Sequence, residues 1–298
     1  MRRFVYIINP VSGTRGKASL QQKIEQLTTK AGFAYDIVYS ARDGNYDFLH
    51  PVIKEKGVTD VVIAGGDGTI NQALNNLKHL DVQFGIVPCG SGNGLAFSAG
   101  ISKNIDRALQ VVFAGKTVWS DAFLINQHFA CMLCGLGFDA EVAHSFANDP
   151  NRGLSTYIKK SVQHFFTAQA YPFELQFGPA PLKLEAFFIS IANSNQFGNH
   201  FTIAPQASLT DGLLDVVIVN KQSKWNLLLQ TARQVTGYNK LQQVELLNKD
   251  ASVIYFQTDA LTIQNKGFAP MHLDGDPIGT APVIEVRLLK KCFRLIVP

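Results

Sequence analysis

The feature that most constrains this fold is a run in which an apolar strand passes directly into a glycine-rich turn and then into a helix. Residues 61–64 are apolar and mostly β-branched, which predicts a buried strand. Gly65 and Gly66 follow, then Asp67 and a third glycine, and Thr69 opens a helical pattern. Glycines let backbone N–H groups approach an anion closely, and the helix N-terminus adds the positive end of its dipole. The run therefore predicts a phosphate-binding loop.

Asp67 gives this loop a chemical character as well. The carboxylate stands where a metal ion or a reacting hydroxyl would lie against bound phosphates. A structural alternative stays open, in which the run is a tight strand-to-helix turn and Asp67 caps the helix.

Two further loops of the same kind follow apolar runs. The run at 4–8 ends in residues 9–13 (NPVSG), with Arg15 and Lys17 just beyond, and the run at 84–87 ends in residues 88–96 (PCGSGNGLA). In open α/β sheets, ligands bind outside the carboxyl ends of the strands. Three glycine-containing turns after three strands therefore predict one shared crevice.

Taken together, these motifs resemble a known family. The motifs are NPVSG at 9–13, GGDGT at 65–69, GSGN at 90–93, TDGLLD at 210–215 and LDGD at 273–276. In this order they resemble the diacylglycerol kinase catalytic domain family, which includes bacterial lipid kinases and sphingosine or ceramide kinases. GGDGT alone also occurs in NAD kinases and phosphofructokinases, but the combination is specific, and the resemblance spans nearly the whole chain.

The resemblance implies that the chain uses ATP with Mg²⁺. The protein must then position ATP, hold the metal and remove a proton from the acceptor hydroxyl, because phosphoryl transfer leaves little covalent chemistry to the enzyme. The residues implied in nucleotide binding are Asn9, Ser12, Gly13, Ser40, Gly65, Gly66, Asp67, Gly68, Thr69, Asn71, Gly90, Ser91, Gly92 and Asn93.

Two carboxylates are the implied catalytic residues. Asp276 falls where relatives carry Glu in a D-G-E motif, so the side chain here is one methylene shorter. Misplacement on the order of 1 Å can cost about a hundredfold in rate, which keeps Asp67 open as the proton acceptor, as in sphingosine kinases. A second, structural cation is implied at a loop that matches a metal site of bacterial relatives, with ligands from Ser208, Asp211 and Leu213.

The acceptor is predicted to be a neutral lipid such as a diacylglycerol. Sphingosine carries an ammonium group that a buried site should pair with a carboxylate. The position where sphingosine kinases place that acid falls on about Ala143, whereas Asp139 and Glu141 match other positions. The alternatives are a sphingosine- or ceramide-type lipid kinase, an NAD kinase-like enzyme acting on a soluble substrate, and a non-catalytic lipid-binding protein.

Composition is compatible with such an enzyme. The chain has 298 residues, 46% of them hydrophobic, and a formal net charge of +4. That length suits two domains with packed cores. Because no apolar run is long enough for a membrane span or a signal peptide, we expect a cytoplasmic protein, peripheral at the inner membrane face, that contributes to phospholipid biosynthesis. The expected partners are the lipid substrate, a transient membrane-surface contact and no nucleic acid, with a homodimer left open.

Two short patterns imitate other functions. Cys131 and Cys134 have the spacing of redox and zinc motifs but lie within an apolar run, which favours core packing. Residues 135–140 match G-x-G-x-x-A, but the acidic residue that a dinucleotide site needs about 20 positions later is absent.

The order of the predicted elements indicates an α/β fold with two domains. Residues 1–117 predict an N-terminal three-layer α/β nucleotide-binding domain, completed by C-terminal strands within 283–298 if these return to it. Residues 118–298 predict a β-rich lipid-binding domain, mainly antiparallel and sandwich-like. Strands are expected at 4–8, 34–39, 58–64, 84–87, 119–125, 128–133, 173–177, 182–192, 213–219, 253–257, 260–264 and 283–289, and helices at about 18–31, 46–56, 69–78, 104–114, 154–169 and 224–236.

Overall fold

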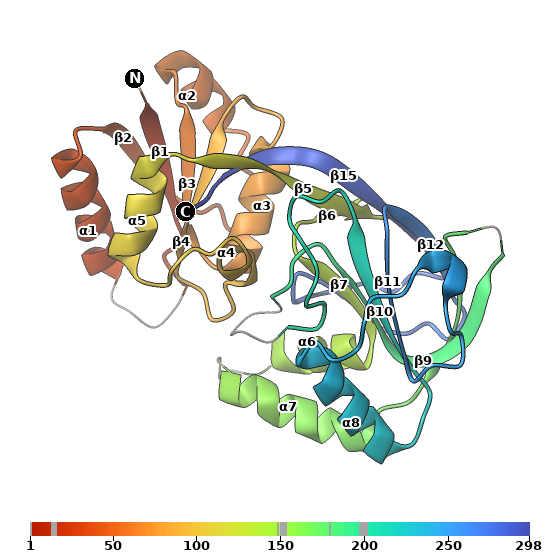
Figure 1. Ribbon diagram of the computed structural model, residues 1–298. Helices are drawn as coiled ribbons and strands as arrows, with labels where there is room; N and C mark the ends of the chain where they lie inside the picture. The colour runs from red at the N-terminus through yellow and green to blue at the C-terminus, as the bar shows by residue number, and fades with distance from the viewer. Residues whose placement is uncertain (1, 13–16, 148, 150–153, 179, 197–201) are drawn as a thin grey trace. The chain divides into compact units, whose positions relative to one another are not determined.

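The computed structural model describes residues 2–12, 17–147, 149, 154–178, 180–196 and 202–298 (Figure 1). The chain divides into two compact units. Unit 1 comprises Met1–Ser120 with Lys291–Pro298, and unit 2 comprises Asp121–Lys290. The division lies a few residues beyond the expected boundary at 117 because strands β5 (Thr117–Ile125) and β15 (Val283–Ile296) each begin in one unit and end in the other.

Unit 1 is built on a parallel sheet. Its strands are β1 (Arg3–Ile8), β2 (Ala34–Tyr39), β3 (Asp60–Gly65) and β4 (Gln83–Pro88), in the order β2-β1-β3-β4, and the end of β15 lies parallel to β4. The helices are α1 (Lys17–Lys30), α2 (Leu49–Lys56), α3 (Asp67–Leu77), α4 (Gly94–Ser98) and α5 (Ile105–Ala114). Right-handed crossovers in opposite directions place α1 and α3 on opposite faces of the sheet (Figure 1). This burial of both faces explains why β1, β3 and β4 are nearly continuous apolar runs.

The strand order places a topological switch point at the carboxyl end of β1. From β1 the chain crosses to β2 on one side, whereas β3 pairs with β1 on the other side. The turns after β1 and β3 are joined by the Asn9 N–H, which donates to the Ala64 carbonyl at 2.9 Å, and the Cys89 N–H after β4 donates to the Gly65 carbonyl at 2.9 Å. The three predicted loops therefore start side by side at a position where α/β sheets bind ligands.

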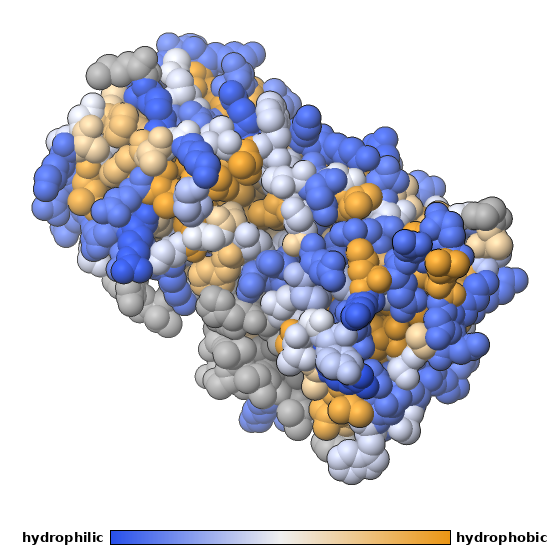
Figure 2. Space-filling view, viewed as in Figure 1, coloured by the Kyte–Doolittle hydropathy of each residue, from blue (hydrophilic) through white to orange (hydrophobic). Residues whose placement is uncertain are grey.

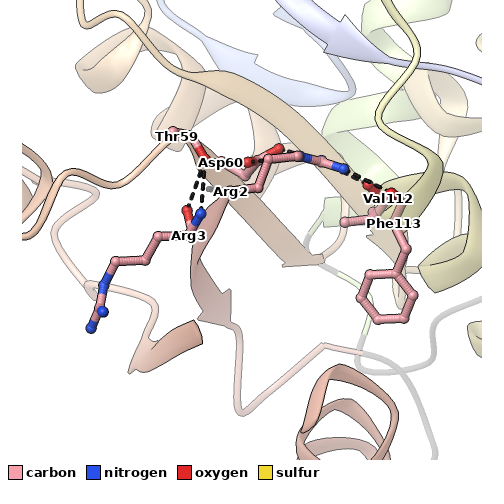
Figure 3. A network of polar contacts seen from close by, with 6 residues as sticks. All are labelled: Arg2, Arg3, Thr59, Asp60, Val112 and Phe113. Atoms are coloured by element: carbon pink, nitrogen blue, oxygen red, sulfur yellow. Dashed lines mark hydrogen bonds and ion pairs between the residues drawn. The ribbon is translucent and has the colours of Figure 1, made fainter. Parts of the chain in front are cut away.

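A structural ion pair closes the opposite end of the same sheet (Figure 3). Asp60, the fully buried first residue of β3, accepts hydrogen bonds from the Arg2 guanidinium at 3.1 and 2.5 Å. Arg2 also donates to the carbonyls of Val112 and Phe113, both at 2.8 Å, in the last turn of α5. Because these groups satisfy one another, we assign this end of the sheet to stability rather than chemistry.

Unit 2 is mainly antiparallel. Besides β5 and β15, its strands are β6 (His128–Ala130), β7 (Leu133–Gly137), β8 (Tyr171–Gln176), β9 (Leu182–Ala192), β10 (Leu214–Asn220), β11 (Val253–Thr258), β12 (Ala260–Asn265), β13 (Met271–Leu273) and β14 (Asp276–Ile278). The helices are α6 (Phe138–Ala147), α7 (Leu154–Thr167), α8 (Lys224–Val235) and the 3-10 turn η1 (Val244–Leu246).

The long strand β9 organises this unit. It pairs with β7, β8 and β10, and β10 continues the pairing to β11, so the strands form a branched, sandwich-like arrangement around a single apolar cluster. The expected α/β unit followed by a β-sandwich-like unit is thus confirmed.

Several element boundaries were predicted wrongly. The expected strand at 128–133 is two strands, β6 and β7, because the backbone between them turns its N–H groups toward the Asp274 carboxylate. Helix α6 and the β13–β14 hairpin were not predicted, and β15 continues to Ile296 instead of ending at 289.

Two other expectations concern apolar packing. Cys131 and Cys134 are both buried, which confirms core packing, and burial raises the pKa of the Cys134 thiol. Within the part of the chain that the structure describes, no helix is both long and apolar enough to cross a membrane.

Candidate functional site

The central loop of unit 1 joins β3 to α3. Gly66 is the N-cap in an extended conformation, and α3 begins at Asp67. Thr69 is buried in the first turn, and its hydroxyl accepts a 2.7 Å hydrogen bond from the Asn9 side chain of the neighbouring loop. A Cβ atom on Gly65 would lie 2.8 Å from the Thr69 Cβ, so the turn requires glycine there. The loop therefore presents backbone N–H groups and a helix N-terminus, with the half-buried Asp67 at its start.

The loop after β3 and the loop after β4 approach each other at two glycines, Gly66 and Gly90. A Cβ on Gly66 would lie 3.2 Å from the Gly90 Cα, and a Cβ on Gly90 would lie 2.6 Å from the Gly66 Cα. Any side chain at either position would push against backbone, which cannot give way as a flexible side chain can. The two strand ends are therefore held close enough for their amides to face one ligand.

Asn93 shapes the third loop from within. It is fully buried in the left-handed conformation, with φ at 58°. Its side chain accepts from the Gly90 N–H at 2.7 Å and donates to the Gly90 carbonyl at 2.8 Å. Ser91 is exposed at the tip, while Gly92 is half-buried. Asn93 thus holds the loop, and Ser91 offers the hydroxyl that a ligand could reach.

The first loop is fixed around Asn9. The Asn9 side-chain oxygen accepts from the Val11 N–H at 2.9 Å, and the Ser12 hydroxyl donates to the Asn9 carbonyl at 3.2 Å. Ser40, at the end of β2, donates its N–H to the Ile8 carbonyl at 2.9 Å. Gly13 and Arg15 lie outside the described residues. The predicted nucleotide residues that are described thus lie at the carboxyl ends of four neighbouring strands, with Asn71 in α3.

Asp276 lies in unit 2, on a tight hairpin. Asp274 and Gly275 form the two-residue turn between β13 and β14, with φ at 49° and 91°. Two consecutive positive φ angles are what a type I′ turn requires, and Asp-Gly is a preferred sequence for it. Asp276 is the first residue of β14, directly after the tight turn, and is exposed.

Asp274 has a structural role in that turn. Its carboxylate accepts the backbone N–H groups of Cys131, Met132 and Leu133 at 3.1, 3.0 and 2.9 Å. Its own N–H donates to the Leu133 carbonyl at 2.8 Å. Of the two acids in LDGD, the first anchors the hairpin, and Asp276 is left as the candidate for chemistry.

A buried histidine–carboxylate pair lies behind the hairpin. His272 Nε2 is 3.1 Å from Asp139 Oδ2, and His272 Nδ1 accepts the Gly275 N–H at 3.3 Å. A Cβ on Gly135 would lie 2.3 Å from both paired atoms, so glycine in β7 makes room for the pair. Two residues of the G-x-G-x-x-A pattern thus serve this pair. Asp139 is the partner of His272, and Gly135 leaves the space in which the two side chains meet.

The predicted cation loop lies among three acids. Asp211 is exposed and accepts the Leu213 N–H at 3.1 Å, and Ser208 accepts the Thr210 N–H at 3.3 Å. Loss of solvent and the nearby Asp121 raise the pKa of Asp211, and burial raises the pKa of Asp215 to about 6. Among the described residues, no group of three or more His, Cys, Asp and Glu side chains is arranged as a metal site.

The carboxylates of α6 are already engaged. Asp139 pairs with His272, and Glu141 accepts the Tyr171 hydroxyl hydrogen bond at 2.8 Å, with His164 3.9 Å away. Ala143, where an amine-binding acid would fall, is buried. Phe187 and Phe188 are also buried, as expected for core residues.

Sequence reasoning missed Asp274 as an anchor, the Asp139–His272 pair and the contributions of Asp121 and Asp215 to the acidic loop. The only sequence signals for them were a histidine directly before LDGD and acids at the ends of apolar runs. These signals are too common to identify partners that lie far away along the chain.

The described residues thus combine a parallel sheet that has glycine loops at its switch point with a β-sandwich-like unit that has an exposed acid on a hairpin. The diacylglycerol kinase catalytic domain profile matches residues 3–125, and the YegS C-terminal NAD kinase beta sandwich-like domain profile matches residues 133–297. The chain therefore belongs to the lipid kinase family that combines these two domains.

Individual relatives agree with this membership. The diacylglycerol kinase of Bacillus subtilis is 25% identical over 97% of this chain and 95% of its own length. An uncharacterised protein of Synechocystis sp. is 27% identical over 98% of this chain and 69% of its own length. The fold matches the crystal structure of a diacylglycerol kinase from Bacillus anthracis str. Sterne with a TM-score of 0.76, at 17% identity, covering 100% of this chain and 97% of the other.

Proposed function

We propose that this protein transfers the γ-phosphoryl group of ATP to the hydroxyl of a diacylglycerol-like neutral lipid. The observation that carries the proposal is the approach of Gly66 to Gly90 at the start of α3, because it brings the backbone amides of two loops to one helix N-terminus. Such a cradle suits the phosphates of a nucleotide.

The chemistry we propose is an in-line displacement. The acceptor oxygen forms a bond to the γ-phosphorus as the bond from that phosphorus to the β–γ bridging oxygen breaks, and ADP leaves. The acceptor proton goes to a carboxylate, for which we propose Asp276 because it is exposed at a rigid turn. Mg²⁺, when bound with ATP, would supply charge neutralisation on the phosphates, and Asp67 at the start of α3 is the carboxylate we assign to it.

A neutral acceptor is favoured by the state of the α6 carboxylates. Asp139 and Glu141 both have partners within unit 2, so pairing either with an ammonium would break an existing contact. An amine without a counter-charge would be costly to bury. The fatty chains would then occupy unit 2, the product would be a phospholipid of the phosphatidate type, and the protein would work in the cytoplasm at the inner membrane face.

One assay tests the proposal. γ-labelled ATP and Mg²⁺ are offered with diacylglycerol, monoacylglycerol, phosphatidylglycerol, sphingosine, ceramide or NAD, the lipids in the same mixed micelles. We expect label in the diacylglycerol or monoacylglycerol product. Preferential labelling of sphingosine or ceramide would move the acceptor to that class, labelling of NAD would make the protein a soluble-substrate kinase, and no labelling would favour a non-catalytic lipid-binding role.

A further inference from the structure

Helix α8 of unit 2 carries an apolar face that projects into solvent. Leu227 and Gln234 point inward and are 2% and 0% exposed, whereas Trp225, Leu228 and Leu229 are 84%, 52% and 55% exposed. The three exposed residues are spaced by three and four positions and therefore lie on one side of the helix. Figure 2 shows apolar surface over α8 with hydrophilic residues at its border. Exposed apolar patches of this kind mark interaction sites.

The charged residues of the segment that carries this face are of one sign, although Lys221 pairs with Glu185 at 2.6 Å. The segment 216–244 contains Lys221, Lys224, Arg233 and Lys240 but no aspartate or glutamate. Arg233 lies over the ring of Tyr238 at 4.2 Å, and Tyr238 is 66% exposed. Tryptophan, tyrosine and arginine flanking an aliphatic stripe are the residue types that settle at the boundary between lipid headgroups and acyl chains.

Lys224 anchors the helix to the unit and is therefore not available to a partner. Its ammonium donates to the carbonyls of Phe165 and Ala168 at the end of α7 and lies 4.8 Å from the centre of the Phe187 ring. The exposed face is thus held on a fixed helix and needs no folding step to bind.

We propose that the face formed by Trp225, Leu228 and Leu229, hereafter the α8 face, docks on an anionic phospholipid surface, with Arg233 and Lys240 contacting the headgroups. The absence of acids in this segment is the charge complementarity that favours an anionic bilayer. The inference rests on the proposed function for its purpose, which is delivery of a lipid acceptor, but docking is measurable without ATP.

Tryptophan fluorescence tests the contact directly. The chain has two tryptophans, so Trp119→Phe leaves Trp225 as the only reporter. Vesicles of phosphatidylcholine with phosphatidylglycerol should shift its emission to the blue, and brominated acyl chains should quench it. Pure phosphatidylcholine should give a smaller shift, and raising the salt should weaken the response because screening lengths fall. An unchanged Trp225 spectrum on vesicles that sediment with the protein would overturn the assignment of this face.

A matched pair of variants tests the energetics. Leu229→Glu should lower co-sedimentation with anionic vesicles by about tenfold or more, because an apolar contact is replaced by a like charge. Leu246→Glu, at a 75% exposed leucine on η1, introduces the same charge elsewhere and should change it by less than about threefold. Equal losses in the two variants would overturn the proposal. So would a change from dimer to monomer in Leu229→Glu by sedimentation velocity, because the face would then join two copies of the chain.

The kinase assay separates this inference from the proposed function. Leu229→Glu should lose phosphorylation of diacylglycerol in vesicles and keep that of a short-chain diacylglycerol dispersed in water. Failure of the wild type to phosphorylate any acceptor, with vesicle binding still dependent on Leu229, would contradict the function and leave the docking face in place.

A second inference comes from the pair behind the hairpin. Because the Gly275 N–H donates to His272 Nδ1, the ring proton lies on Nε2 and is donated to Asp139. The pair thereby joins α6 to the turn that carries Asp276, and it packs so closely on Gly135 that any side chain there would displace it. We infer that His272 is a positioning residue, which acts through the turn on the Asp276 carboxylate.

Two substitutions test this role. Ala at position 272 has no group that can reach Asp139, whereas the side-chain amide of Gln can place an N–H donor where the Nε2 atom of His272 lies. His272→Ala should lower kcat by about ten- to a hundredfold, as expected for small misplacements of a reacting group, with KM for ATP unchanged and faster exchange of the Gly275 amide. His272→Gln should recover much of kcat. A loss of folded protein with normal kcat in the remainder would make the pair structural only, and the exchange measurement stays informative if the wild type shows no kinase activity.

Discussion

The two units hold their polar groups in different ways. In unit 1 the decisive contacts are local or between adjacent strand ends, such as Asn93 with Gly90 three residues away and Gly66 against Gly90. In unit 2 the partners are distant in sequence, with Asp139 and His272 separated by 133 residues and Leu133 and Asp274 by 141. The proposed phosphate site can thus be encoded in short motifs, whereas the placement of the proposed proton acceptor depends on the whole unit.

Glycine illustrates the same difference. Gly66 and Gly90 lack side chains so that two backbones can approach each other, and Gly135 lacks one so that two side chains can approach each other. Only the first use is visible in a sequence motif. We therefore expect a substitution at the proposed site in unit 2 to lower kcat and a substitution in the glycine loops of unit 1 to abolish ATP binding.

The largest effect is expected at Asp276 of unit 2. Asp276→Asn removes the proposed proton acceptor, and general base catalysis contributes about 10²–10⁴ in rate. We expect kcat to fall by that factor while ATP affinity is retained, because the group is needed mainly in the transition state. Steady-state kinetics with an ATP-binding titration measure both quantities.

Asp259→Asn is the matched control for this change. Asp259 is an exposed acid of the same unit, paired with Lys290 at 3.2 Å. It should leave kcat unchanged. Near wild-type turnover in Asp276→Asn would instead assign proton removal to Asp67 or to the substrate itself. Unit 2 would then supply no catalytic carboxylate.

In unit 1 the expected failure is in binding. ATP with Mg²⁺ at a hundredfold excess over its Kd should stabilise the wild type by about 2.7 kcal/mol, seen as a rise in Tm. Gly66→Val should abolish the rise, because the side chain would fill the space between the two loops. Gly279→Val, where a Cβ would meet nothing within 4 Å, is the control. An equal rise in Gly66→Val would remove this loop from the nucleotide site.

The sequence predicts the structure of unit 1 better than that of unit 2. The parallel strands of unit 1 and the loops after them were predicted because each strand is an apolar run that ends in glycine, and that signal lies within about ten residues. Strands β6 and β7 were predicted as one because the interruption at Cys131 and Met132 is made by Asp274, far along the chain. The resemblance placed Asp276 in a motif, but only the hairpin geometry separates its role from that of Asp274.

A smaller effect on stability is expected from the acidic loop of unit 2. Burial raises the pKa of Asp215 from 3.8 to about 6, so between these values the folded state binds a proton that the unfolded state does not. Stability should therefore fall as pH rises from about 4 to 6, by about 1.4 kcal/mol per unit of pKa shift, and this loss is fully present at pH 7.

Asp215→Asn tests this sign. The amide oxygen can still accept from Tyr255, which contacts one carboxylate oxygen at 2.5 Å. The new NH2 takes the place of the oxygen that accepts from Gln257 at 3.0 Å, and it can donate to the Gln257 side-chain oxygen once that amide turns over. In metal-free buffer the variant should be more stable than the wild type at pH 7 and equal to it near pH 4, by urea denaturation at each pH. A wild type that gains stability between pH 4 and 6 relative to the variant would show that Asp215 is stabilised as the anion and that the buried acids of unit 2 are not under strain.

The smallest effect is expected at Glu141, a half-buried carboxylate that would be the alternative ligand if unit 2 recognised an amine. Its carboxylate accepts from Tyr171 at 2.8 Å, so we expect Glu141→Gln to leave the ratio of kcat/KM for diacylglycerol and sphingosine unchanged in mixed micelles. Gln keeps an acceptor oxygen for Tyr171, which makes a structural loss small. A clear preference of the wild type for sphingosine, lost about tenfold or more in Glu141→Gln, corresponds to at least ~1.4 kcal/mol of charge recognition. That result would contradict the neutral acceptor and would show that a carboxylate of unit 2 can serve a ligand while it holds the fold.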